Sequence, residues 1–171
     1  IDALAPTVSV VVDKPAGTLR SGEVATLTFT VSEAVGSDAL TSAEVLVTGG
    51  TITGFGAGPG SNQYTATFTP AANSTTTALI GVGASAVTDT VGNPNAATPL
   101  VSLAVDTVAP TVSVSSSVTA LNATSTALLS ITLSEASTDF SAQDVGLNGL
   151  GTLTSFGGDG SGRNYTAVFT P

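Results

Sequence analysis

The chain has 171 residues, enough for one large domain or two small ones. Twelve acidic residues against three basic ones give a net charge of −9, so the chain lacks the basic patches that nucleic acids and anionic membranes require. It contains no Cys or His, which excludes disulfides, thiol chemistry and the usual catalytic triads. No apolar run reaches the roughly 18 residues that a membrane-spanning helix needs.

The composition favours β-structure throughout the chain. Hydrophobic residues make up 42% of the sequence and are mainly Val, Ala, Leu and Ile, accompanied by abundant Ser and Thr, 19 Gly and 8 Pro. Such residues form strands and tight turns, whereas the helix formers Lys, Glu, Gln, Arg and Met are nearly absent. We therefore predict an all-β fold.

Apolar and polar residues alternate in several short segments. The first are residues 7–12 and residues 25–31, and the latter place Ala, Leu, Phe and Val on one face and three Thr on the other. This period of two is typical of strands with one buried and one solvated face. Further strands are predicted at residues 45–48, 51–55, 64–68, 77–82 and 100–105, separated by Gly-rich or Pro-containing turns at 49–50, 56–60 and 92–95. Seven strands in about 100 residues are the pattern of an immunoglobulin-like β-sandwich.

The same alternation predicts which side chains form the core. The residues expected to point inward are Val8, Val10, Leu27, Phe29, Val31, Tyr64, Ala66, Phe68, Ile80 and Val82. A catalytic site that used carboxylates alone, as in glycoside hydrolysis, needs a cleft lined by aromatic residues. Because the few aromatic residues are expected in the core, we predict that the protein is not an enzyme.

The sequence repeats itself. Four anchor segments recur in the same order: residues 1–4 at 105–108, 5–10 at 109–114, 31–34 at 133–136 and 62–70 at 163–171. The offset falls from 104 at the first anchors to 101 at the last, as expected for repeats that differ by small deletions in their loops. A single large barrel is disfavoured because the same strand order begins again at Ala109.

The repeat defines the predicted domain boundaries. We expect residues 1–4 to be the end of a preceding repeat, residues 5–106 a complete repeat, residues 107–108 a short junction, and residues 109–171 a second repeat truncated by its last two strands. A sandwich without these two strands exposes its core and an unpaired strand edge. The missing strands are therefore expected from a longer polypeptide or from another chain.

The sparse acidic residues form the candidate functional site. Glu33 follows a predicted strand, and Asp106 lies in the join between the copies. Asp89 lies in the turn between the last two strands, four residues before Asn93. We expect these segments to meet at one pole of the sandwich, where converging carboxylates repel one another unless a cation such as Ca²⁺ lies among them. The sequence thus predicts a structural calcium site formed by Glu33, Asp89, Asn93 and Asp106.

A simpler interpretation of these residues remains open. In it, Glu33 is a solvated strand end and Asp89 is the first residue of an Asx-turn. Two Gly-rich segments, residues 54–60 and residues 157–162, are expected to be hairpin tips, because each lies between the same two predicted strands of its copy. The first lacks the spacing of a phosphate-binding loop, and the second resembles a calcium-binding nonapeptide that works only in stacked copies.

The anchors taken together resemble a known family. In order they read Asp-Thr-x-Ala-Pro-Thr-Val, Phe-Thr-Val-Ser-Glu-Ala, Tyr-Thr-Ala-Thr-Phe-Thr-Pro and Thr-Asp-Thr-Val-Gly-Asn. This order resembles the bacterial immunoglobulin-like repeats of giant biofilm-associated and type-I-secreted surface adhesins, over essentially the whole chain. The resemblance implies an extracellular stalk whose repeats are often stiffened by Ca²⁺ at their junctions. The copies depart from one another at Glu44, where the second has Asp144, and the second copy's Asp-x-x-Gly-Asn turn lies outside the sequence.

Three functions are compatible with this sequence. We favour a stalk or extender of a bacterial cell-surface adhesin or biofilm protein, whose partners are the neighbouring repeats of the same polypeptide. The second is a subunit of an extracellular filament or S-layer that exchanges strands between chains. The third is a glycan- or protein-binding module, which needs exposed aromatic residues at its loop tips. Only Phe55, Phe140 and Phe156 are candidates for that role, and the alternation predicts that they are buried.

Overall fold

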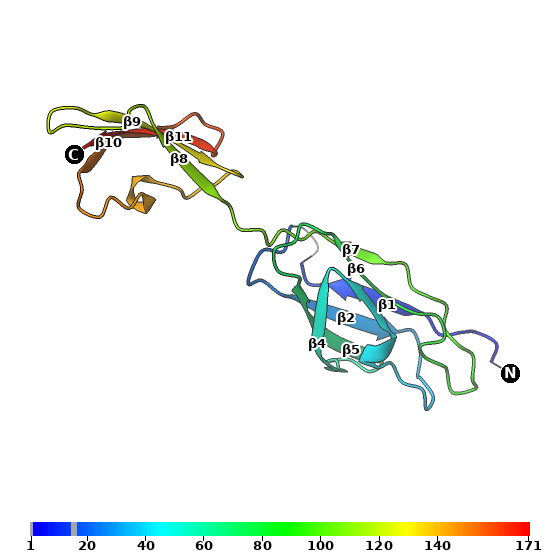
Figure 1. Ribbon diagram of the computed structural model, residues 1–171. Helices are drawn as coiled ribbons and strands as arrows, with labels where there is room; N and C mark the ends of the chain where they lie inside the picture. Colours follow the sequence, from blue (N-terminus) through cyan, green and yellow to red (C-terminus); the bar gives the residue numbers. More distant parts are fainter. Residues whose placement is uncertain (1, 15–16) are drawn as a thin grey trace. The chain divides into compact units, whose positions relative to one another are not determined.

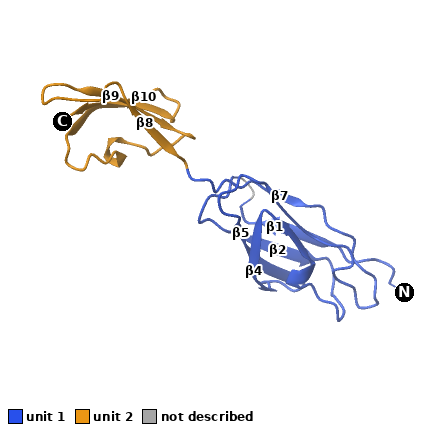
Figure 2. Cartoon of the chain, viewed as in Figure 1, with its two compact units in different colours: residues 1–109 blue, residues 110–171 orange. Residues whose placement is uncertain are grey.

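The computed structural model describes residues 2–14 and 17–171, and the chain divides into two compact units. Unit 1 comprises Ile1–Ala109 and unit 2 comprises Pro110–Pro171 (Figure 2). Apart from two short 3₁₀ helices, the regular structure of the described residues consists of strands, which confirms the all-β prediction (Figure 1). Across the described part of the chain, no helix has the length and apolar character needed to cross a membrane.

The first sheet of unit 1 contains four antiparallel strands. They are β1 (Val8–Val12), β2 (Ala25–Val31), β4 (Gly50–Ala57) and β5 (Gln63–Pro70), in the order β1-β2-β5-β4. The register pairs apolar residues with apolar residues across the strands: Val8 lies opposite Val31, and Phe29 lies opposite Tyr64. Because directly opposed residues share a face, one side of this sheet is continuously apolar.

The second sheet of unit 1 contains three antiparallel strands. They are β3 (Val45–Thr48), β6 (Ala78–Val82) and β7 (Val101–Leu103), in the order β3-β6-β7. Four strands in the order first, second, fifth, fourth facing three in the order third, sixth, seventh form the arrangement of a constant-type immunoglobulin sandwich. The seven predicted strands of this repeat are therefore confirmed, with ends that move by one or two residues.

The core of unit 1 lies between these two sheets. Of the residues predicted to point inward, Val10 and Tyr64 are partly buried and the others are buried. Leu19 and Val87 are also fully buried, although neither lies in a strand. Leu19 forms a parallel bridge with Val105, so the connection between β1 and β2 is folded back onto the core.

Unit 1 has two ends, which we call the entry pole and the exit pole. At the entry pole, the Thr7 amide donates to the Ser32 hydroxyl and the Ser32 amide donates to the Thr7 carbonyl. At the exit pole, the amide of Asp106 donates to the carbonyl of Leu19. The seven residues of β2 run between the poles, which places them about 20 Å apart.

Unit 2 repeats only the first sheet. Its strands β8 (Val112–Ser116), β9 (Ala127–Leu133), β10 (Thr152–Gly158) and β11 (Asn164–Thr170) have the order β10-β11-β9-β8, which matches β4-β5-β2-β1. Residues 110–171 are all described and contain no second sheet. The truncated sandwich expected from the sequence is therefore present as a single four-stranded layer.

The difference between Glu44 and Asp144 has a structural explanation. Each closes a capping box on a 3₁₀ turn, η1 (Ser42–Glu44) or η2 (Ala142–Asp144). The Glu44 carboxylate accepts from the Thr41 amide at 2.8 Å, and the Asp144 carboxylate accepts from the Ser141 amide at the same distance. The same cap therefore forms with either acidic side chain.

The division between the units lies near the predicted one but does not coincide with it. The chain divides after Ala109, whereas the expected junction was residues 107–108. Residues 2–4, expected to be the end of a preceding repeat, lie within unit 1, where Nδ2 of Asn93 donates to the Leu4 carbonyl at 3.4 Å.

Candidate metal centre

Three carboxylates converge at the entry pole of unit 1. One oxygen from each of Asp2, Glu33 and Asp89 lies within 4.8 Å of the other two. Asp2 is exposed, Glu33 is half-buried and Asp89 is only 3% exposed. Two of these residues, Glu33 and Asp89, were predicted from the sequence, and Asp2 was not.

The backbone at the entry pole explains why these groups meet. Glu33 lies two residues beyond β2, and the following residues turn against the loop between β6 and β7. Val35 forms an antiparallel bridge with Asp89, and the Gly36 amide donates to the Thr88 carbonyl at 2.9 Å. A Cβ atom on Gly36 would lie 2.7 Å from the carbonyl oxygen of Asp89, so this close approach requires a glycine.

Asp89 is held by hydrogen bonds from its own turn. Its Oδ1 accepts from the amides of Val91 and Asn93 at 2.9 and 2.8 Å, and its Oδ2 accepts from Nδ2 of Asn93 at 2.6 Å. Burial alone would raise the pKa of Asp89, but the hydrogen bonds from Asn93 and Val91 outweigh it and lower the pKa. The carboxylate is therefore stabilised in its charged form although it is buried.

Asn93 joins this turn to the segment that enters the unit. Besides Asp89, its Nδ2 donates to the carbonyls of Asp2 and Leu4 at 3.3 and 3.4 Å. These bonds hold Asp2 and Asp89 in place and use only the side-chain nitrogen. An Asn binds Ca²⁺ through its side-chain oxygen, which takes no part in them. The structure thus brings the predicted residue Asn93 to the site.

The charge at this pole is not compensated by a basic residue. Among residues 2–14 and 17–171, the ion pair between Lys14 and Glu23, at 3.1 Å, does not involve the cluster, and no basic side chain pairs with it. Ca²⁺ binds oxygen ligands at 2.3–2.6 Å, so two ligands of one ion lie at most about 5.2 Å apart. The observed separations and the purely oxygen donors fit a hard cation such as Ca²⁺.

The structure does not bring Asp106 to this cluster. Asp106 follows the last strand and lies at the exit pole, where its amide is bonded to Leu19. The prediction assumed that the linker leaving a repeat lies at the same pole as the end of β2, but β7 runs toward the opposite pole. The cluster instead uses the segment that enters the repeat. By the offset of 104, Asp2 is the counterpart of Asp106, and this match was the signal that could have identified it.

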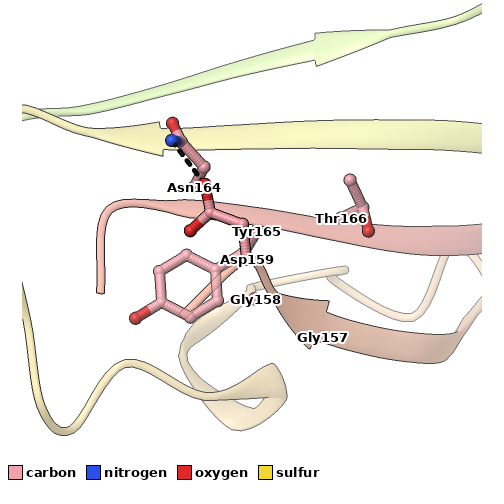
Figure 3. Close-up of a pocket in the computed structure, with 6 residues that line it drawn as sticks. All are labelled: Gly157, Gly158, Asp159, Asn164, Tyr165 and Thr166. Atoms are coloured by element: carbon pink, nitrogen blue, oxygen red, sulfur yellow. Dashed lines mark hydrogen bonds between the residues drawn. The ribbon is translucent and has the colours of Figure 1, made fainter. Parts of the chain in front are cut away.

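A second acidic group, at the tip of the β10–β11 hairpin, is satisfied by the hairpin itself. The Asp159 carboxylate accepts from the Ser161 amide at 2.8 Å. It also accepts from Nδ2 of Asn164 at 2.9 Å, next to the ring of Tyr165 (Figure 3). These bonds, led by those of Ser161, lower the pKa of Asp159 to about 2. The Gly-rich segment 157–162 is thus a hairpin tip, as predicted from the sequence.

The two units together define a class of protein: tandem immunoglobulin-like β-sandwiches, the second present as one sheet. The family model for the bacterial Ig-like domain matches residues 2–105 and again residues 106–171. The chain therefore belongs to the bacterial Ig-like domain family. No curated protein shows significant similarity to it. Domains of this family are structural modules that are often exposed on the cell surface, which supports a structural surface repeat.

Proposed function

We propose that this chain is part of the stalk of a bacterial cell-surface adhesin or biofilm protein, and that calcium fixes the entering segment to the body of each complete repeat. The observation that carries the proposal is the position of the two ends of unit 1. The chain enters at one pole and leaves at the other, and hydrogen bonds hold both segments to the sandwich. A repeat with this geometry can be joined end to end without a flexible linker.

The exit segment is attached through Thr107. This residue is only 6% exposed, its hydroxyl donates to the Ala71 carbonyl at 2.6 Å, and it accepts from the Ser74 amide at 2.9 Å. At the entry pole, the corresponding attachment depends on Asp2, whose carboxylate would be repelled by Glu33 and Asp89. A bound Ca²⁺ turns this repulsion into attraction, so the cation would tie the entering segment to the repeat.

The aromatic residues support a structural role over ligand binding. Phe55 packs against Phe29 and Tyr64 with ring centroids 5.8 and 5.7 Å apart. In unit 2, Phe140 lies 5.9 Å from Phe156 and 5.0 Å from Tyr165. The three residues that a glycan-binding module would present at its loop tips are instead engaged with other aromatic rings.

The calcium part of the proposal is tested by thermal unfolding of the full chain in calcium and in chelator. Sites of this kind in extracellular modules have a Kd of about 10⁻⁴ to 10⁻³ M, so about 10 mM Ca²⁺ would stabilise unit 1 by about 1.5 to 3 kcal/mol. Glu33→Gln replaces a charged ligand with a neutral, weaker one, and no hydrogen bond of the described residues ends on the Glu33 carboxylate. We expect this variant to lose the calcium response and to be at least as stable as the wild type in chelator, because it relieves repulsion.

Asp38→Asn is the matched control. Asp38 is exposed and lies outside the cluster, so the variant makes the same change in charge and keeps the response to calcium. A wild-type melting temperature that is equal in calcium and in chelator would refute the calcium site. The stalk is tested separately by small-angle scattering from concatenated copies of residues 2–108. The maximum dimension should grow in proportion to the number of copies, and compact particles would contradict the proposal.

A further inference from the structure

Three asparagines of the chain lie in a motif that the calcium site does not use. Asn73, Asn122 and Asn164 are each followed, two residues later, by Thr, and the residue between is not Pro. This is the pattern of an N-glycosylation acceptor, in which the nitrogen of the Asn side chain is joined to a sugar. The pattern also arises by chance in a chain rich in Ser and Thr, so the sequence alone selects none of the three. The structure distinguishes them.

Two of these asparagines are poorly suited to that reaction. Asn164 begins β11, and its Nδ2 is occupied by the hydrogen bond to the Asp159 carboxylate. Asn73 lies in the connection between β5 and β6, and within the described part of the chain no hydrogen bond joins it to the hydroxyl of Thr75. Neither residue combines a free amide nitrogen with a hydroxyl that is bound to the amide oxygen.

Asn122 combines these two features. It lies in the loop between β8 and β9, and its Oδ1 accepts from the amide and from the hydroxyl of Thr124, both at 3.0 Å. The Ser125 hydroxyl donates to the same oxygen at 2.7 Å. No hydrogen bond of the described residues involves Nδ2 of Asn122, and Asn122, Ala123 and Thr124 are all exposed. The side chain thus forms an Asx-turn that engages its oxygen and leaves its nitrogen free.

The backbone turn beneath this motif is common to both units. The Ser125 amide donates to the Asn122 carbonyl at 3.1 Å. In unit 1, at the same spacing before β2, the Glu23 amide donates to the Arg20 carbonyl, also at 3.1 Å. There the turn is closed by the Glu23 carboxylate, which accepts from the Arg20 amide. Unit 2 closes the equivalent turn with the amide and the hydroxyls of an acceptor motif.

We propose that Asn122 is an N-glycosylation site, modified by a glycosyltransferase whose donor is a glycosyl diphosphate. Nδ2 forms a bond to C1 of the sugar while the bond from C1 to the diphosphate oxygen breaks, and its electron pair leaves with the diphosphate. A base of the enzyme takes one proton from Nδ2. Hydrogen bonds to Oδ1 draw electron density from the amide, so this proton is lost more readily. The inference does not depend on the calcium site or on the stalk function.

The test measures the masses of peptides of the chain isolated from the cells that make it. Cleavage before each Asp separates the three motifs, which fall in residues 38–88, 106–138 and 159–171. We expect a sugar on residues 106–138 and not on the other two peptides, with fragmentation placing it on Asn122. The proposal is wrong if residues 106–138 carry no sugar, or if either of the other peptides carries one to the same extent.

Two variants made in the same cells test the role of the hydroxyl. Thr124→Val removes it and should leave Asn122 unmodified, whereas Thr124→Ser keeps it and should be modified. Circular dichroism checks that both variants fold. Equal modification of the two would contradict the part that the Asx-turn plays.

The source of the donor is identified with purified, unmodified chain. One sample is incubated with cytosol of the same cells and a labelled nucleoside diphosphate sugar, and another with their membranes, which hold labelled polyprenyl diphosphate sugars. Transfer to residues 106–138 in the first sample identifies a nucleotide sugar as the donor, and transfer in the second identifies a lipid-linked one. Transfer in neither sample would contradict the proposal.

Discussion

The carboxylates of this chain differ in what holds them. Asp89 and Asp159 accept hydrogen bonds from their own turns, and both pKa values lie below the ordinary range of an aspartate. Neither residue needs a cation to remain charged. Glu33 is different, because no hydrogen bond of the described residues ends on its carboxylate, and the fold places it beside Asp2 and Asp89 at the entry pole. At this scale, Asp89 has both roles: its own turn holds its carboxylate, and the fold places that carboxylate beside Asp2 and Glu33.

Asp159 gives a prediction about pH. Its pKa falls from an ordinary 3.8 to about 2 in the folded chain, so the stabilisation is complete above 3.8 and disappears as the pH falls toward 2. Asp159→Asn removes the ionised group, and the variant should unfold at a lower temperature than the wild type at pH 5. The difference should shrink between pH 4 and pH 2, as followed by circular dichroism. A difference that is constant over this range would show that Asp159 acts by packing alone.

At the scale of strands, the sequence predicted most of the strands and their buried faces. The alternation of Thr with Leu, Phe and Val in residues 25–31 predicted β2 and its buried face without error. It could not predict Leu19, because a buried residue in an irregular segment leaves no periodic signal. Nor could it predict Asn95, which is 3% exposed and whose Oδ1 accepts from the amides of Ala86 and Val87. The burial and hydrogen bonds of Asn95 depend on loop backbone that becomes ordered only in the folded state.

The hairpin bulge offers a test of strand geometry. The register of β10 shifts after Thr154, and that of β4 shifts at the equivalent position, after Thr53. The next residue has a positive φ in each strand: 52° at Ser155 and 62° at Gly54. Ser155→Gly should stabilise unit 2 by about 0.5 to 1 kcal/mol, because glycine adopts this conformation without strain. The reciprocal Gly54→Ser should destabilise unit 1 by a similar amount. Denaturant unfolding measures both, and effects of equal sign would contradict this account.

At the scale of the whole molecule, the repeat predicted two sandwich copies but not which pole each end occupies. Asp106 was placed at the wrong end because alternation gives the faces of strands and says nothing about the direction in which the last one leaves. That direction follows from the number of strands: the chain reverses at each connection, so the last of seven strands runs in the same direction as β1 and leaves at the opposite pole. Asp2, the counterpart of Asp106, is present in the sequence. Only the fold shows that the acidic cluster includes the aspartate of the entering segment and not that of the departing one.

The attachment of the exit segment gives a prediction at this scale. Thr107→Val keeps the shape of the side chain but leaves the Ala71 carbonyl and the Ser74 amide without their hydroxyl partner. We expect a loss of about 1 to 3 kcal/mol from unit 1 and faster exchange of the Ser74 amide. Thr77→Val, at an exposed position, is the control and should change stability by less than about 0.5 kcal/mol. Unchanged exchange at Ser74 would mean that the hydroxyl is not what holds the exit segment.

The entry of the chain at one pole and its departure at the other also determines how unit 1 responds to tension. A pull on its two ends acts along β1 from its first residue and along β7 from its last, parallel to both strands. The hydrogen bonds that join β1 to β2 run across the strands, so the load falls on all of them together and they must slide before any can open. Had both ends lain at one pole, the same pull would have opened the pairs one after another. We therefore expect unit 1 to resist stretching, because its β1–β2 hydrogen bonds are loaded in shear. This property suits a chain that is held at one end and loaded at the other.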